Sequence, residues 1–138
     1  NPRHKIVEYE DELWHPLAAA DVVVMRAGAG SLFDVAATGR ASILIPFPYA
    51  TGDHQLHNAR YFTEKAAADL MLDDQVTVGT LRARVEGLLN DEQRRNDFAA
   101  NMRNLATPEA AGTVAAQLLE AAKVTTSAIT IDQRGRRV

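Results

Sequence analysis

The chain has 138 residues, a formal net charge of −3, 24% charged residues and 46% hydrophobic residues, which is the composition of a single ordinary globular domain. This charge excludes the strongly basic surface typical of nucleic-acid-binding proteins, and the absence of cysteine excludes disulfides and thiolate metal sites. The longest apolar run, Ala18–Met25, contains Asp21 and is too short to span a membrane.

The chain begins at Asn1 without an initiator methionine and soon enters a strand-like segment, Lys5–Tyr9. We expect upstream sequence to be missing, because an isolated strand needs neighbours with which to pair. A helix is predicted over Asp11–Ala20, with Asp11 as its N-cap and Pro16 disturbing its middle.

Two apolar runs rich in β-branched residues predict strands buried on both faces, at Asp21–Met25 and Ser42–Ile45. Between them, a glycine-containing turn at Arg26–Gly30 leads into a predicted helix over Ser31–Thr38. Gly39 follows in the position of the glycine that commonly ends a helix. This order predicts a β-α-β unit.

The second half of the chain is predicted to be mostly helical. The loop Phe47–Gly52 leads into a helix that begins near Asp53, and Ala68–Leu72 predicts a third short strand. Apolar residues then recur at helical spacing in two segments, the first with Leu81, Val85, Leu88 and Leu89, the second with Phe98, Met102 and Leu105. Pro108 is expected to open a last helix.

Strands that alternate with helices predict the α/β class, with a Rossmann-like open parallel sheet. Ligands of such sheets bind outside the carboxyl ends of the strands, so the loops after Tyr9, Met25 and Ile45 are the expected places for a site. We expect one domain over residues 1–123 and a disordered tail over residues 124–138, which are polar and lack periodicity.

The turn after Met25 has the features of a phosphate-binding site. Gly28 and Gly30 let the backbone approach a ligand closely, and the helix start offers unpaired N–H groups. The alternative is a tight turn in which Ser31 is the N-cap. A nicotinamide dinucleotide fingerprint is excluded because Phe33 stands where a small residue is needed, and the sequence lacks the Gly-Lys-Ser/Thr of a P-loop.

Asp34 lies three residues after Ser31 and has two interpretations. In one, it completes a capping box with Ser31. In the other, its carboxylate accepts hydrogen bonds from the vicinal hydroxyls of a ribose. The residues alone leave both open and favour the cap.

Polar side chains gather where the helix near Asp53 begins, with Asp53 as a candidate N-cap. His54, Gln55 and Asn58 supply the mixed donors and acceptors that sugar hydroxyls need, and the alternative is a solvated helix start. His54 and His57 lack the spacing of metal ligands. The sequence also lacks a nucleophile elbow or a Ser-His-Asp arrangement.

Together, these loops and strands resemble the donor-binding half of the MurG-like glycosyltransferases, glycosyltransferase family 28. The resemblance is close over Asp21–Ala59, where Arg-Ala-Gly-Ala-Gly-Ser and Gly-Asp-His-Gln-Leu-His-Asn match at the expected separation, and it extends loosely from Tyr9 to about Ala122. It implies the later part of the C-terminal domain of the two-domain glycosyltransferase-B architecture. The upstream glycine-rich donor loop and the N-terminal domain are expected to be missing.

The resemblance also implies which residues bind the donor. The backbone near Glu10 would meet uracil, Asp34 would bind the ribose hydroxyls, and Arg26 would orient the turn. The diphosphate would lie against Gly28, Ala29, Gly30 and Ser31, and the sugar hydroxyls against His54, Gln55 and Asn58. Asp34 stands where glutamate is usual and is one methylene shorter, and His54 stands where some members have glutamine. No residue is assigned as catalytic.

The implied reaction is inverting transfer of N-acetylglucosamine from UDP-N-acetylglucosamine to the lipid-linked muramoyl-pentapeptide, which converts lipid I to lipid II in peptidoglycan synthesis. The acceptor would bind through the N-terminal domain at the cytoplasmic face of the cell membrane. No metal, cofactor or nucleic acid is expected. The alternatives are another family 28 transferase (a glycolipid synthase or a subunit with a separate partner), a UDP-sugar epimerase, or a nucleotide-binding module without catalysis.

Overall fold

The computed structural model describes residues 4–122, and the chain divides into two units after Ala106. The first unit contains α1 (Trp14–Ala19), β1 (Val22–Met25), α2 (Ala29–Thr38), β2 (Ala41–Leu44), the 3₁₀ turn η1 (Thr51–Asp53), α3 (His54–Thr63), β3 (Ala68–Leu70), the 3₁₀ turn η2 (Asp73–Gln75), α4 (Val78–Asn90) and α5 (Glu92–Asn104). The second unit contains α6 (Ala110–Ala121). The alternation of strands and helices confirms the predicted α/β class.

The strands form one open sheet in the order β1-β2-β3. Both pairings are parallel, with Val22 opposite Ala41 and Ser42 opposite Ala68. The carboxyl ends of all three strands therefore lie at one edge of the sheet, and the loops that follow them leave from that edge. The predicted open parallel sheet is confirmed.

The central strand is the most deeply buried part of the sheet. All four residues of β2 are buried, and the hydroxyl of Ser42 donates to the carbonyl of Arg40 at 3.0 Å. In β1, Val24 is 40% exposed. Burial on both faces is therefore correct for β2 and wrong for β1, which lies at the edge of the sheet that residues 4–122 form and has a neighbouring strand on one side only.

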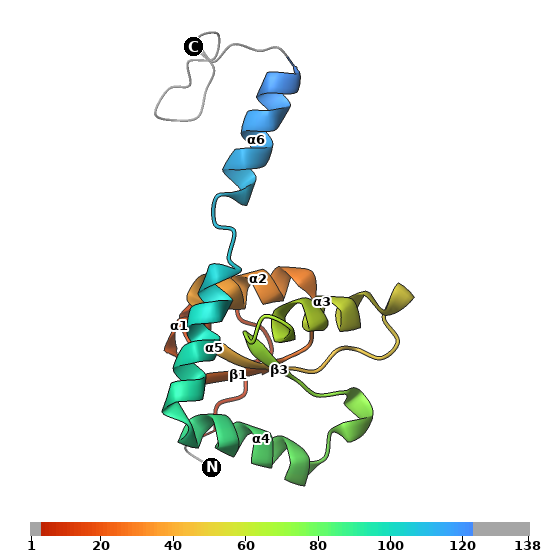
Figure 1. Cartoon of the computed structure of the whole chain (residues 1–138), viewed down its shortest axis with the longest axis vertical. Coiled ribbons are helices and arrows are strands. Elements are labelled where there is room, and N and C mark those ends of the chain that lie inside the picture. Colours follow the sequence, from red (N-terminus) through yellow and green to blue (C-terminus); the bar gives the residue numbers. More distant parts are fainter. Residues whose placement is uncertain (1–3, 123–138) are drawn as a thin grey trace. The chain divides into compact units, whose positions relative to one another are not determined.

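Two apolar clusters lie on opposite faces of the sheet. Alternate residues of β2 point to opposite faces, so Leu44 belongs to one cluster and Ile43 to the other. The helices contribute Leu17, Leu32, Val35, Ala36, Phe62 and Met102 to the first cluster, and Leu88 and Phe98 to the second. Helices α2 and α3 thus cover one face, α4 covers the other, and α5 contributes to both (Figure 1).

The segment before β1 differs from the prediction. Lys5–Tyr9 forms no strand, and its side chains are exposed. Helix α1 begins at Trp14, so Asp11 is not its N-cap. Pro16 lies in the first turn of this short helix, where a backbone N–H has no intrahelical partner, and it therefore causes no disturbance.

The predicted helical spacing in the second half is confirmed by α4 and α5. Leu88, Phe98 and Met102 are buried, as that spacing predicted. Leu89 is 46% exposed, because eight residues rotate a side chain by about 80° from Leu81 and carry it out of the apolar stripe.

Helix α6 begins two residues after Pro108, so the proline precedes this helix rather than opening it, and no residue of α6 is buried. The predicted tail over residues 124–138 lies outside the described residues, and the domain boundary at residue 123 stays a prediction. Within residues 4–122, no helix is long and apolar enough to cross a membrane.

Candidate functional site

The loop after β1 is fastened to the start of α3 by two side-chain amides. The Oε1 of Gln55 accepts hydrogen bonds from the backbone N–H of Ala27 at 3.1 Å and of Phe47 at 3.0 Å. The amide of Asn58 donates to the carbonyl of Ala27 at 3.1 Å. Since Ala27 is fully buried, its backbone groups need such partners. Gln55 therefore joins the loops after β1 and β2.

These two hydrogen bonds use only the oxygen of the Gln55 side-chain amide and leave its nitrogen available. Its nitrogen has no acceptor among residues 4–122, and it carries two N–H donors. Gln55 lines a hollow of about 300 Å³ together with Arg26, Gly28 and Ser31. A ligand in this hollow would meet a donor whose orientation is already set.

Helix α2 begins earlier than predicted. Gly28, not Ser31, is its N-cap, and the N–H of Leu32 donates to the Gly28 carbonyl at 3.0 Å. The extended backbone of Gly28 suits this position, which glycine tolerates well. In the described part of the chain, the N–H groups of Ala29, Gly30 and Ser31 have no acceptor. A helix start in this condition is suited to binding an anion.

Neither glycine of the turn is required by the backbone or by internal packing. Gly28 has a φ of −67° and Gly30 lies inside α2, so neither needs the left-handed region. A Cβ atom at either position would meet no atom within 4 Å. Gly39 differs, because its φ of +60° favours glycine. The space above Gly28 and Gly30 is thus open to a group from outside the chain.

Asp34 lies on the exposed surface of α2. Because Gly28 is the N-cap, Asp34 falls in the second turn and the predicted capping box with Ser31 is wrong. Its carboxylate has no hydrogen-bond partner within the described residues. Residues three apart on a helix are neighbours, so Asp34 lies on the same side of α2 as Ser31.

Three other residues that the sequence analysis singled out, Glu10, Asp53 and His54, lie outside the hollow beside Gln55. The Nδ1 of His54 lies 2.7 Å from the carbonyl oxygen of Thr51. Asp53 occupies the N-cap position of α3, but its side chain makes no capping hydrogen bond. Before α1, the carboxylate of Glu10 accepts from the N–H of Glu12 at 3.3 Å. The hollow beside Gln55 is lined by none of these residues.

Arg26 is bonded to the neighbouring loops rather than to its own turn. Its Nη1 donates to the carbonyls of Ile45 at 3.4 Å and Pro46 at 3.2 Å, and to Oδ1 of Asp73 at 2.5 Å. The guanidinium lies 5.7 Å from the centre of the Phe47 ring. Arg26 therefore braces the loops after β2 and β3. The sequence did not reveal Asp73, because it lies 47 residues away without a local motif.

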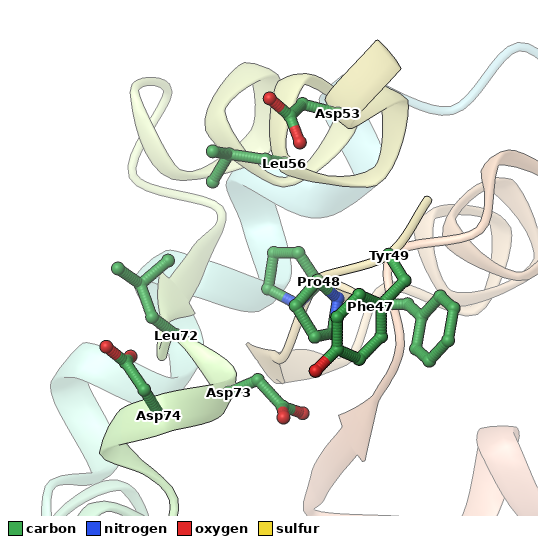
Figure 2. A pocket seen from close by; sticks show the side chains of 9 residues that line it. Phe47, Pro48, Tyr49, Asp53, Leu56, Leu72, Asp73 and Asp74 are labelled. Carbon is green, nitrogen blue, oxygen red and sulfur yellow. The ribbon is translucent and has the colours of Figure 1, made fainter. Parts of the chain in front are cut away.

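A larger hollow of about 400 Å³ lies beside Asp73, the partner of Arg26. Figure 2 shows Asp53 and Leu56 on one side, Leu72, Asp73 and Asp74 on a second, and Phe47, Pro48 and Tyr49 on a third. The Tyr49 side chain is 84% exposed. Phe47, Pro48 and Tyr49 belong to the loop after Ile45, where a site was expected. Leu72, Asp73 and Asp74 were not predicted, because no sequence spacing connects them with that loop.

The predicted donor-binding residues are therefore only partly brought together. Ala29 and Asn58 line a third hollow of about 300 Å³ between α2 and α3, with Phe33 and Tyr61. Glu10, Gly30, Asp34 and His54 line none of the three hollows. Across the described part of the chain, no group of three or more His, Cys, Asp or Glu residues could hold a metal ion.

Comparisons with known proteins give consistent results. A family model described as the glycosyltransferase family 28 C-terminal domain matches residues 1–121. The chain is 57% identical to the UDP-N-acetylglucosamine--N-acetylmuramyl-(pentapeptide) pyrophosphoryl-undecaprenol N-acetylglucosamine transferase of Rubrobacter xylanophilus, over 89% of this chain and 37% of that protein. The transferase of the same name from Salinibacter ruber is 40% identical, over 86% of this chain and 32% of that protein.

The structural comparison covers a similar portion. The crystal structure of Acinetobacter baumannii MurG is similar with a TM-score of 0.76 at 26% sequence identity, over 84% of this chain and 33% of that chain. The chain thus spans about a third of the length of the proteins that it matches.

Proposed function

The chain is a glycosyltransferase family 28 C-terminal domain. On this basis we propose that it binds UDP-N-acetylglucosamine as the donor half of an inverting N-acetylglucosaminyltransferase. The names of the two transferases above contain this donor and this activity. Since the chain spans 37% of the Rubrobacter protein, we assign acceptor binding to a part of the enzyme that this chain does not match.

The observation that carries the proposal is the open space above Gly28 and Gly30. It supports a diphosphate lying against Gly28, Ala29, Gly30 and Ser31, where the N–H groups at the start of α2 have no other acceptor among the described residues. These groups and the helix dipole would stabilise the charge that develops on UDP as it leaves.

The remaining donor contacts follow from the positions of the side chains. We assign the ribose hydroxyls to Asp34, which is exposed on the same side of α2 as Ser31. The amide nitrogen of Gln55 is our leading candidate for the sugar hydroxyls, with the further contacts assigned to His54 and Asn58. We keep the backbone near Glu10 for uracil, and Arg26 positions the loops that surround the site.

The proposed acceptor is the lipid-linked muramoyl-pentapeptide that the relatives' names contain. Its hydroxyl would displace UDP in line, converting lipid I to lipid II for peptidoglycan synthesis. A lipid-linked acceptor requires the enzyme to work at the membrane surface, and we propose a peripheral location on its cytoplasmic face.

The function is tested by a chimera in which residues 1–121 replace the matching third of the Rubrobacter xylanophilus transferase. We expect the chimera to transfer N-acetylglucosamine from UDP-N-acetylglucosamine to the acceptor at a rate within about tenfold of the parent enzyme. A folded chimera that binds neither UDP nor UDP-N-acetylglucosamine by calorimetry contradicts the proposal.

The ribose contact is tested in the same chimera by Asp34→Ala. We expect UDP affinity to fall about tenfold, since hydrogen bonds to a charged group are lost, and the loss to be smaller for 2′-deoxy-UDP. The unfolding temperature should not change, because Asp34 is exposed. Asp97→Ala, which removes an exposed acid of α5, is the control. Equal losses of affinity in both variants refute the assignment.

A further inference from the structure

A cluster of arginines lines a hollow at the edge of the sheet where the strands begin. Arg40, Arg95 and Arg103 surround a space of about 360 Å³, and Asp21 is its single lining acid. Asp21 directly precedes β1 and Arg40 directly precedes β2, so this edge is opposite to the donor loops. We propose that the hollow binds a phosphate group and forms a second anion site, separate from the donor site.

The charges around this hollow are not neutralised by the protein. Four other arginines form ion pairs with carboxylates, namely Arg26, Arg82, Arg84 and Arg94. Within residues 4–122, no carboxylate forms an ion pair with Arg40, Arg95 or Arg103. Because the chain as a whole has a net charge of −3, three cations beside one acid are a local excess of positive charge that favours an anion.

Two of these guanidinium groups are held in place by backbone carbonyls. Arg40 donates to the carbonyl of Ala20 at 3.3 Å, and Arg95 donates to the carbonyl of Leu88 at 2.9 Å. Arg40 also donates to the carbonyl of Ala18 through Nη2, and Arg95 uses only its Nη1, which donates to Leu89 as well. A guanidinium carries five N–H donors, so both groups keep donors for a ligand. Their fixed positions lower the entropic cost of binding one.

The third arginine, Arg103, also lines the hollow. Its guanidinium makes no hydrogen bond or ion pair with the described residues. A methyl group at Gly39 would overlap the Arg103 side chain, so glycine at that position allows the arginine to lie across the turn between α2 and β2. Arg95, Ala99 and Arg103 lie four residues apart on one face of α5. The small side chain of Ala99 lines the hollow between the two arginines in this row.

Phosphate is the anion that suits this arrangement. Its oxygens surround a tetrahedral centre, so that several guanidinium groups can donate to one phosphate from different directions. The volume of about 360 Å³ is that of a small-ligand site. A free phosphate compound and the headgroup of an anionic lipid would make the same contacts, and the experiment distinguishes these two sources.

The test is a titration of the 138-residue chain with inorganic phosphate at constant ionic strength, followed by the NMR signals of its backbone amides. We expect saturable shifts at Arg40 and Arg103 and at Asn96, which also lines the hollow. Arg103→Gln should weaken phosphate binding about tenfold. Arg60→Gln is the matched control. It removes the same charge from an exposed arginine of α3 that does not line the hollow, and it should change the affinity by less than about twofold.

Shifts at Gly30 and Ser31 report phosphate at the donor site and are followed separately. Co-sedimentation with phosphatidylglycerol vesicles, compared with phosphatidylcholine vesicles, identifies the source. Vesicle binding that Arg103→Gln weakens assigns the site to a lipid headgroup, whereas binding of inorganic phosphate alone assigns it to a free phosphate compound. The proposal is overturned if neither ligand binds, or if Arg60→Gln weakens binding as much as Arg103→Gln.

Discussion

A substitution of Gly30 is expected to change protein stability and ligand affinity in opposite directions. A methyl group there meets no atom of the protein, and alanine is the better helix former. Gly30→Ala should therefore raise the free energy of unfolding by about 0.5 kcal/mol. In the chimera it should lower UDP affinity at least about tenfold, because the methyl group occupies the proposed place of the diphosphate.

The control for this variant is Gly87→Ala in α4, where a Cβ atom also meets nothing within 4 Å. It should stabilise the protein by about 1 kcal/mol and leave UDP affinity unchanged. Denaturant unfolding and calorimetry measure the two quantities. If Gly30→Ala keeps full UDP affinity, the diphosphate does not lie against this turn.

Gln55 combines a structural role with a proposed binding role. Gln55→Ala removes the acceptor of two backbone N–H groups and should lower the free energy of unfolding by about 1–3 kcal/mol. Asn58→Ala removes one hydrogen bond and should lower the free energy of unfolding by about 1 kcal/mol.

In the chimera, Gln55→Ala should weaken binding of UDP-N-acetylglucosamine more than binding of UDP. Equal weakening of both ligands removes the sugar-contact assignment.

The sequence predicts the types of residue at the site better than the bonds that they make. The phosphate-type turn and the polar start of α3 were found from local patterns. The two bonds of Gln55 Oε1 and the bond between Arg26 and Asp73 were not, because they join segments whose separation depends on the packing of the sheet. Ser31 was predicted as the N-cap from residue preference alone, whereas the backbone places Gly28 there.

At the scale of the elements, the register of α4 can be tested with two adjacent leucines. Leu88 is fully buried and Leu89 is 46% exposed. Leu88→Ala should lower the free energy of unfolding by about 2–5 kcal/mol through loss of burial and a residual cavity. Leu89→Ala should cost less than about 1 kcal/mol. Equal costs in chemical denaturation would mean that α4 is rotated from the register described.

The two strands β1 and β2 and the helices α4 and α5, which the sequence predicted, all pack against neighbours within the described chain. The runs at β1 and β2 pair with each other, and α4 and α5 bury the apolar stripe that their spacing predicts. Lys5–Tyr9 has a similar weak alternation, but it remains exposed and forms no strand. A strand is stabilised by its partner, and alternation alone does not supply one.

At the scale of the whole molecule, the first unit contains both apolar clusters and every candidate site residue. Removal of residues 107–138 should therefore lower the unfolding temperature by less than about 4 °C. Any UDP affinity that the chain shows should remain. Thermal unfolding followed by circular dichroism checks the first expectation and calorimetry the second. A fall of more than about 10 °C would mean that the second unit contributes to the fold of the first.

The two hydrogen bonds that Gln55 accepts have a consequence for the exchange of amide protons with solvent. The amide protons of Ala27 and Phe47 share one acceptor, so a single rotation of the Gln55 side chain breaks both hydrogen bonds. Their deuterium uptake therefore follows one opening event instead of two. A donor sugar that accepts a hydrogen bond from the nitrogen of the same amide would slow that rotation. Binding of the sugar would then slow deuterium uptake at both Ala27 and Phe47, which are 20 residues apart in the sequence.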